Sequence, residues 1–224
     1  QKVRPSEFLR IDPASLASLE ILRTLRGESS RGTLLETIDQ TLTGMGGRLM
    51  RSLLCMPLCD SARIRRRQDA VQELVDHDTV CAGLRDLLKD VADLQRIVAR
   101  ISTGRAAPKD LVAAAQTLRK IPPMRRLLSE CEADLLAALA AQCDSMDELA
   151  DLLDKAIVPE PPAHLRDGGV IRTGFDEQLD RFRSLSKDGK SFLADYQQKE
   201  ITRTGIANLK IGFNKVFGYY IEVS

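Results

Sequence analysis

Few residues of this 224-residue chain have the types and spacings that chemistry requires. The two histidines, His77 and His164, have no acid, nucleophile or metal ligand beside them at a motif spacing. Cys55 and Cys59 are four residues apart, but Pro57 separates them and no second Cys or His pair follows at zinc-ligand spacing. We therefore expect no catalytic residue and no metal site in this chain.

The stretch from Gly27 to Gly32 has the glycine spacing of a phosphate-binding loop. Thr33 and Leu34 replace the Lys and Ser/Thr that such a loop needs, and no buried strand precedes it. We interpret this stretch as a turn and expect no nucleotide-binding site.

A local run of arginines is the strongest charge feature and consists of Arg63, Arg65, Arg66 and Arg67. Such a run can hold phosphates, but on an amphipathic helix it is more often a solvated face. The chain has 33 Lys and Arg against 32 Asp and Glu, a net charge of +1, so no overall field draws it to nucleic acid. Any DNA contact must be local.

No apolar run is long enough to span a membrane, so we expect a cytosolic protein. The five cysteines are odd in number, and we expect them to be reduced thiols.

The elements that would position such residues are mostly helices, because aromatics make up only 4% of the chain while Leu and Ala are abundant. Asp12 and Pro13 predict the start of a helix over 13–26. Apolar residues from Val80 to Ile101 recur at steps of three and four and predict one helical stripe of about six turns. That stripe suits the core of a bundle, with a dimer seam as the alternative.

The end of the chain has a different pattern. Residues 158–174 are rich in Pro and Gly and predict a connection. From Phe175 a single helix of about thirty residues is expected. After Gly205 the apolar period becomes two, which predicts a β-hairpin around 214–216. The expected fold is mainly α: an elongated multi-helix domain over 1–204 whose long last helix leads into a short antiparallel β-hairpin, the start of a second, β-rich domain over 205–224.

Several stretches carry a family resemblance, among them Leu9–Glu20, Met45–Arg51 and, most specifically, Thr204–Val223. Together with the order in which they occur, they resemble the core and the start of the clamp in the MutS family of DNA mismatch-repair ATPases. In that family the core helices act as a lever between an ATPase domain and a clamp that holds the duplex backbone without reading bases. The resemblance implies that residues 1–204 are the first part of the lever and 205–224 the truncated beginning of the clamp.

The resemblance also implies partners and limits. Lys210 and Lys215, on the hairpin, are the candidate DNA-backbone contacts. Double-stranded mismatched DNA, the remaining domains of the same chain, a second copy in a homodimer and downstream mismatch-repair proteins are the expected partners, in the bacterial cytoplasm at the nucleoid. ATP and Mg²⁺ belong to the full-length protein, because no Gly-x-x-x-x-Gly-Lys-Ser/Thr loop occurs in these 224 residues and the fragment itself is not expected to be an enzyme.

Two further expectations concern the long helix. Phe175-Asp176-Glu177 spells the family's mismatch-reading motif, but it opens the helix and is interpreted as coincidence. If the chain is a piece that ends at Ser224, Phe182, Leu193 and Tyr196 lack their covering partner, and self-association would hide them.

The alternative function is a helical scaffold that uses the 80–101 stripe or the long helix as an interaction seam without touching DNA. A small-molecule enzyme is the least supported class.

Overall fold

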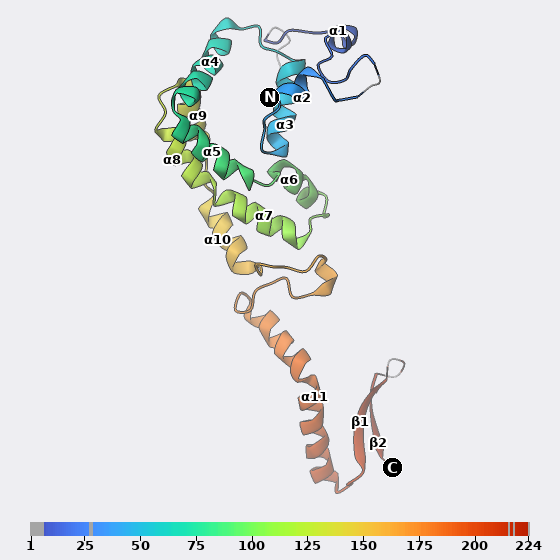
Figure 1. Ribbon diagram of the computed structural model, residues 1–224. Coiled ribbons are helices and arrows are strands. Elements are labelled where there is room, and N and C mark those ends of the chain that lie inside the picture. Colours follow the sequence, from blue (N-terminus) through green and yellow to red (C-terminus); the bar gives the residue numbers. More distant parts are fainter. Residues whose placement is uncertain (1–6, 27–28, 215, 217, 224) are drawn as a thin grey trace. The chain divides into compact units, whose positions relative to one another are not determined.

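The computed structural model describes residues 7–26, 29–214, 216 and 218–223. The chain forms two compact units, Gln1–Val170 and Ile171–Ser224 (Figure 1). The first contains α1 (Pro13–Ser18), α2 (Leu34–Ile38), α3 (Gly44–Cys55), α4 (Ser61–Asp76), α5 (Asp78–Lys89), α6 (Leu94–Ser102), α7 (Pro108–Leu118), α8 (Ile121–Ser129), α9 (Asp134–Gln142), α10 (Asp147–Ala156) and the 3-10 turn Leu165–Asp167. The second contains α11 (Glu177–Thr204), β1 (Leu209–Asn214) and β2 (Gly218–Val223). The mainly α class is confirmed. The compact units divide after Val170, so the long helix and the hairpin belong to the same unit. The predicted domain boundary at 204/205 stays a prediction.

The first predicted helix is shorter than expected. Asp12 caps it as predicted, with its carboxylate accepting hydrogen bonds from the backbone N–H groups of Ala14 and Ser15 at 3.0 Å. The prediction that it continues to residue 26 is wrong, because Glu20 has a positive φ of 48°. The Glu20 carboxylate then accepts from the N–H of Leu25 at 2.7 Å, which stabilises a turn in place of further helix.

The 80–101 stripe is divided between two helices, so the prediction of one continuous helix is wrong. Asp93 acts as the N-cap of α6 and accepts from the N–H of Arg96 at 3.2 Å. Just before it, the N–H of Ala92 donates to the hydroxyl of Thr117 in α7 at 3.0 Å. These two bonds satisfy backbone groups that a continuous helix would use internally, so the helix breaks between Lys89 and Leu94.

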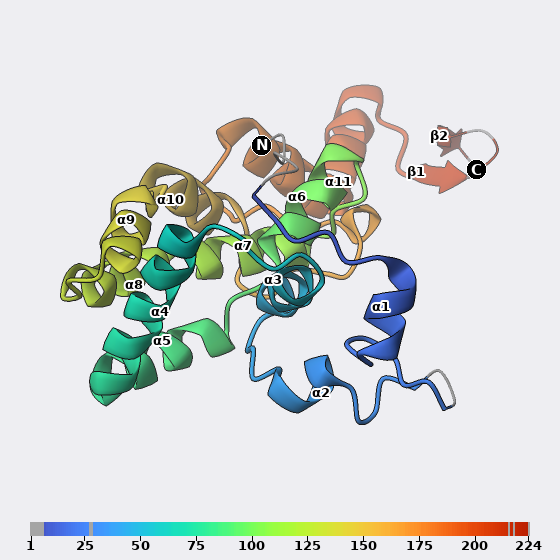
Figure 2. The same cartoon turned by 90° about the horizontal axis from the view of Figure 1, so that it is seen from above.

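The core of the first unit lies where α4, α5, α8 and α9 meet. Ala70, Cys131 and Leu136 are buried together there. Figures 1 and 2 show α8 and α9 lying side by side next to α4 and α5, as their contacts indicate. The small residues Ala115 of α7 and Ala150 of α10 are both buried, which suits the close packing of those two helices.

The second unit has the two elements that the sequence predicts. α11 is one helix of 28 residues, capped by Asp176, whose carboxylate accepts from the N–H of Leu179 at 2.8 Å. It ends at Gly205 in the left-handed conformation that glycine adopts without strain. The hairpin of β1 and β2 follows and is antiparallel.

Within the described residues, no helix combines the length and the apolar character that crossing a membrane requires.

Candidate functional site

The hairpin has one apolar and one polar face. Pairing of Leu209 with Val223 fixes the register, so that Ile211 faces Ile221 and Phe213 faces Tyr219. Because side chains alternate along a strand, these three pairs share one face. The other face contains the pairs Lys210 with Glu222, Gly212 with Tyr220, and Asn214 with Gly218.

Lys210, the first candidate DNA contact, is exposed on the polar face. Its cross-strand partner is Glu222, so a carboxylate stands directly across the ladder from the ammonium group. Lys215, the second candidate, lies outside the described residues. The polar face therefore offers one described cation, whose field is reduced by a neighbouring anion.

The end of the hairpin is organised by a local turn and an aromatic pair. The Asn214 side-chain oxygen accepts from the N–H of Val216 at 2.7 Å, a bond typical of tight turns. Gly218 has φ of 75°, which a residue with a side chain rarely adopts. The rings of Phe213 and Tyr219 lie 5.0 Å apart at 58° on the apolar face, and both remain exposed.

Tyr220 covers the glycine opposite it. A Cβ atom placed on Gly212 would lie 2.6 Å from Cζ and 2.7 Å from the hydroxyl oxygen of Tyr220. An aromatic ring over a cross-strand glycine compensates for the missing side chain in a strand. The ring also places its hydroxyl on the polar face that carries Lys210.

The long helix exposes aromatic side chains. Phe182 is 65% exposed and Tyr196 41% exposed, in agreement with the predicted uncovered positions, while Leu193 is half-buried. Phe192 stacks on Tyr196 with ring centroids 6.4 Å apart. Self-association through these residues stays a prediction.

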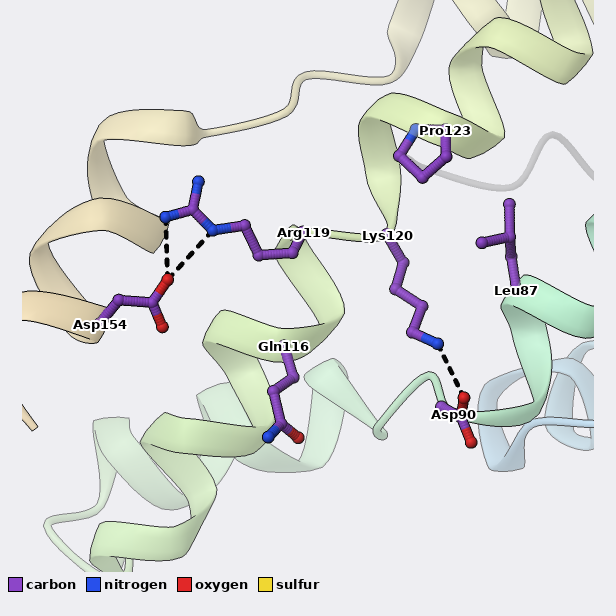
Figure 3. A pocket seen from close by; sticks show the side chains of 7 residues that line it. All are labelled: Leu87, Asp90, Gln116, Arg119, Lys120, Pro123 and Asp154. Carbon is purple, nitrogen blue, oxygen red and sulfur yellow. Dashed lines mark hydrogen bonds and ion pairs between the residues drawn. The ribbon is translucent and has the colours of Figure 1, made fainter. Parts of the chain in front are cut away.

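A cleft of about 610 Å³ in the first unit is lined by Leu87, Asp90, Gln116, Arg119, Lys120, Pro123 and Asp154 (Figure 3). Arg119 donates to Asp151 and, at 2.8 Å, to Asp154, while Lys120 pairs with Asp90 at 2.8 Å. The bond from Arg119 lowers the pKa of Asp151 below its ordinary range. Each of the two cations is therefore paired with a carboxylate. Arg119, directly after α7, is linked to α10, and Lys120, directly before α8, is linked to the end of α5. No sequence motif indicated the cleft, because the partners are about 30 residues or more apart.

Comparison with known proteins decides what this arrangement is. A family model for MutS domain III matches residues 14–214, from α1 to the end of β1. The chain belongs to the MutS domain III family. DNA mismatch repair protein MutS from Salinibacter ruber is 42% identical over 218 residues, and that from Symbiobacterium thermophilum is 43% identical over 220 residues. The matches cover 97% and 98% of this chain but 24% and 25% of those proteins, so the chain spans about a quarter of the length of the curated relatives it matches.

A third MutS relative, from Methanothrix thermoacetophila, is 43% identical over 224 residues, with 99% of this chain and 26% of that protein covered. The recognised family thus extends over nearly the whole chain. It accounts for the helical unit and α11 together with β1.

The remaining candidates from the sequence have structural partners in this MutS domain. Arg63 pairs with Glu7 at 2.7 Å, and Arg66 donates to the backbone carbonyl of Asp134 at 3.0 Å, so part of the arginine run stabilises the fold. The described residues contain no group of His, Cys, Asp and Glu that could hold a metal ion. Thr33, at the end of the glycine-spaced stretch, is buried and caps α2.

Proposed function

We propose that this chain is the lever and the beginning of the DNA clamp of a mismatch-repair protein. The observation that carries the proposal is that α11, within a chain matched by the MutS domain III family, continues into the hairpin inside one compact unit. A helix of 28 residues extends over about 42 Å. A displacement at one end of such a helix reaches the other end because the helix is stiff along its axis.

The hairpin is proposed to approach the phosphate backbone through its polar face. Lys210 is exposed there, and Lys215 follows Asn214, the last residue of β1, in the sequence. Lysine contacts to phosphate carry no sequence information, which suits a clamp that holds any duplex. Glu222 beside Lys210 keeps the contact weak and dependent on salt.

The other functions of the longer protein are proposed to lie outside these residues. ATP and Mg²⁺ would bind in another domain, whose state the lever would pass to the clamp. Mismatched double-stranded DNA, the remaining domains of the chain, a second copy of the protein and downstream mismatch-repair proteins are the proposed partners. The proposed location is the bacterial cytoplasm, at the nucleoid.

The test is duplex binding by the full-length protein over a salt series. Replacement of both Lys210 and Lys215 by Ala should weaken binding and lower the slope of log K against log salt by about 2, roughly 0.9 for each lost phosphate contact. Lys109→Ala, an exposed lysine on α7, is the control and should leave the slope unchanged. An unchanged slope in the double variant would show that the hairpin lysines do not contact phosphate.

A second candidate function is supported by exposed apolar side chains. Val98 and Ile101 of α6 are exposed although Ile97 beside them is buried, and Phe182 is exposed on α11. Such residues suit a helical scaffold that binds another protein. Absence of salt-dependent duplex binding, together with concentration-dependent self-association in light scattering, would favour this function.

A further inference from the structure

Gln197 is a polar residue at an apolar position of α11. Leu193, Gln197 and Ile201 are spaced four residues apart, share one helix face and are all half-buried. This part of α11 packs against β1, where Leu209 is only 5% exposed. A stripe that packs on a strand is normally apolar throughout, so an amide in its middle requires a specific partner.

That partner is the backbone of β1. The N–H of Ile211 donates to Oε1 of Gln197 at 3.2 Å. In an antiparallel pair, alternate residues direct their backbone groups away from the neighbouring strand. Ile211 is such a residue, as is Leu209, whose N–H donates to the carbonyl of Ile206 at 3.3 Å. Gln197 thus satisfies an edge N–H on the side of β1 that faces the helix.

The connection between helix and hairpin needs such a restraint. Gly205 ends α11 with φ of 71°, and its N–H donates to the carbonyl of Ile201 at 2.9 Å. A Cβ atom on Gly205 would have no heavy atom within 4 Å, so the turn has open space around it. Apolar contacts between Leu209 and the helix are non-directional and tolerate sliding. A hydrogen bond between one side chain and one backbone group fixes a single position along the helix axis.

We infer that Gln197 is a positioning residue that holds the hairpin at one place along α11, so that helix and hairpin move together. This inference rests on the proposed function for its consequence in DNA binding, although the restraint itself is a property of the second unit. Without the bond, the hairpin turns about the junction at Gly205, and its polar face meets the duplex in a wider range of orientations. Ordering it on DNA then costs conformational entropy and weakens binding.

The experiment compares three variants of the full-length protein. Gln197→Leu keeps the packing with Leu193 and Ile201 but removes the acceptor. Gln197→Glu keeps an acceptor oxygen, and Gln198→Leu, at the exposed neighbouring position, is the matched control. Hydrogen–deuterium exchange at the Ile211 amide measures the bond, duplex affinity measures its consequence, and far-UV circular dichroism confirms that the helices remain folded.

Gln197→Leu should speed exchange at Ile211 roughly 3- to 10-fold, the factor expected for loss of one net hydrogen bond. It should also weaken duplex binding, while Gln197→Glu and Gln198→Leu remain close to the parent in both measurements. Unchanged exchange in Gln197→Leu would overturn the inference. Faster exchange with unaltered duplex affinity would uphold the positioning role of Gln197 and contradict the proposed clamp function instead, so the two failures are distinguishable.

Discussion

Asp93 combines a helix cap with an ion pair that joins distant parts of the first unit. Its carboxylate accepts from both terminal nitrogens of Arg48 in α3, at 2.6 and 2.8 Å, and caps α6 through the N–H of Arg96. The hydrogen bonds from Arg48 are the main reason that the pKa of Asp93 is lowered from 3.8 to about 2. A lowered pKa means that the folded state favours the ionised carboxylate.

The pH dependence of stability follows from that shift. The contribution of Asp93 is complete above pH 3.8 and is lost as the pH falls towards 2, because the unfolded state binds the proton first. Asp93→Asn retains a good capping side chain but removes the charge, so we expect the thermal midpoint of unfolding to fall by roughly 2–4 °C at neutral pH. The difference from the parent should shrink between pH 4 and pH 2 in calorimetric scans. The control, Asp86→Asn, removes an exposed pair with Lys89 and should have little effect. A difference that is constant over this pH range would contradict the ion-pair explanation.

At the scale of elements, the hairpin depends on the cover that Tyr220 gives to Gly212. In Gly212→Val the new side chain displaces the Tyr220 ring, since its Cβ would lie 2.6 Å from that ring. We expect the second unit to lose about 1 kcal/mol, the upper range for one cross-strand pair. In a Tyr220→Ala background the same change should be stabilising, because valine suits a strand and glycine does not. Chemical denaturation followed at the hairpin measures both effects, and destabilisation in both backgrounds would show that the ring is not responsible.

The elements also show what sequence periodicity can and cannot predict. The long helix and the hairpin were predictable because their patterns are local: Asp176 caps the helix, Gly205 ends it, and alternation sets the strands. The break between α5 and α6 was not, because in one of the bonds that stabilise it the N–H of Ala92 donates to the hydroxyl of Thr117, which lies 25 residues further along the chain. Local alternation also predicted that Lys210 lies on the hairpin. The bond from the N–H of Ile211 to Gln197 was missed, because its two partners lie in different elements. An amide in an apolar stripe was the available signal, and its partner lies 14 residues away in a different element.

At the scale of the whole molecule, the two compact units each contain a glycine that a side chain of a neighbouring element contacts closely. In the first unit, a Cβ atom on Gly83 of α5 would lie 3.0 Å from Cδ1 of Leu127 in α8, so this glycine permits the close contact of those helices. In the second, Gly212 is covered by Tyr220. These two sites share no partner, and they belong to different units.

Independent sites of this kind should contribute additively to the free energy of unfolding. Gly83→Val should destabilise the chain by about 1–3 kcal/mol through overpacking against Leu127. Combined with Gly212→Val, the loss should equal the sum of the single effects within about 0.5 kcal/mol, whereas Gly212→Val and Tyr220→Ala should be strongly non-additive. Denaturation of the single and double variants, followed by probes in each unit, measures both cycles. A large coupling energy between Gly83 and Gly212 would contradict the independence of these two sites.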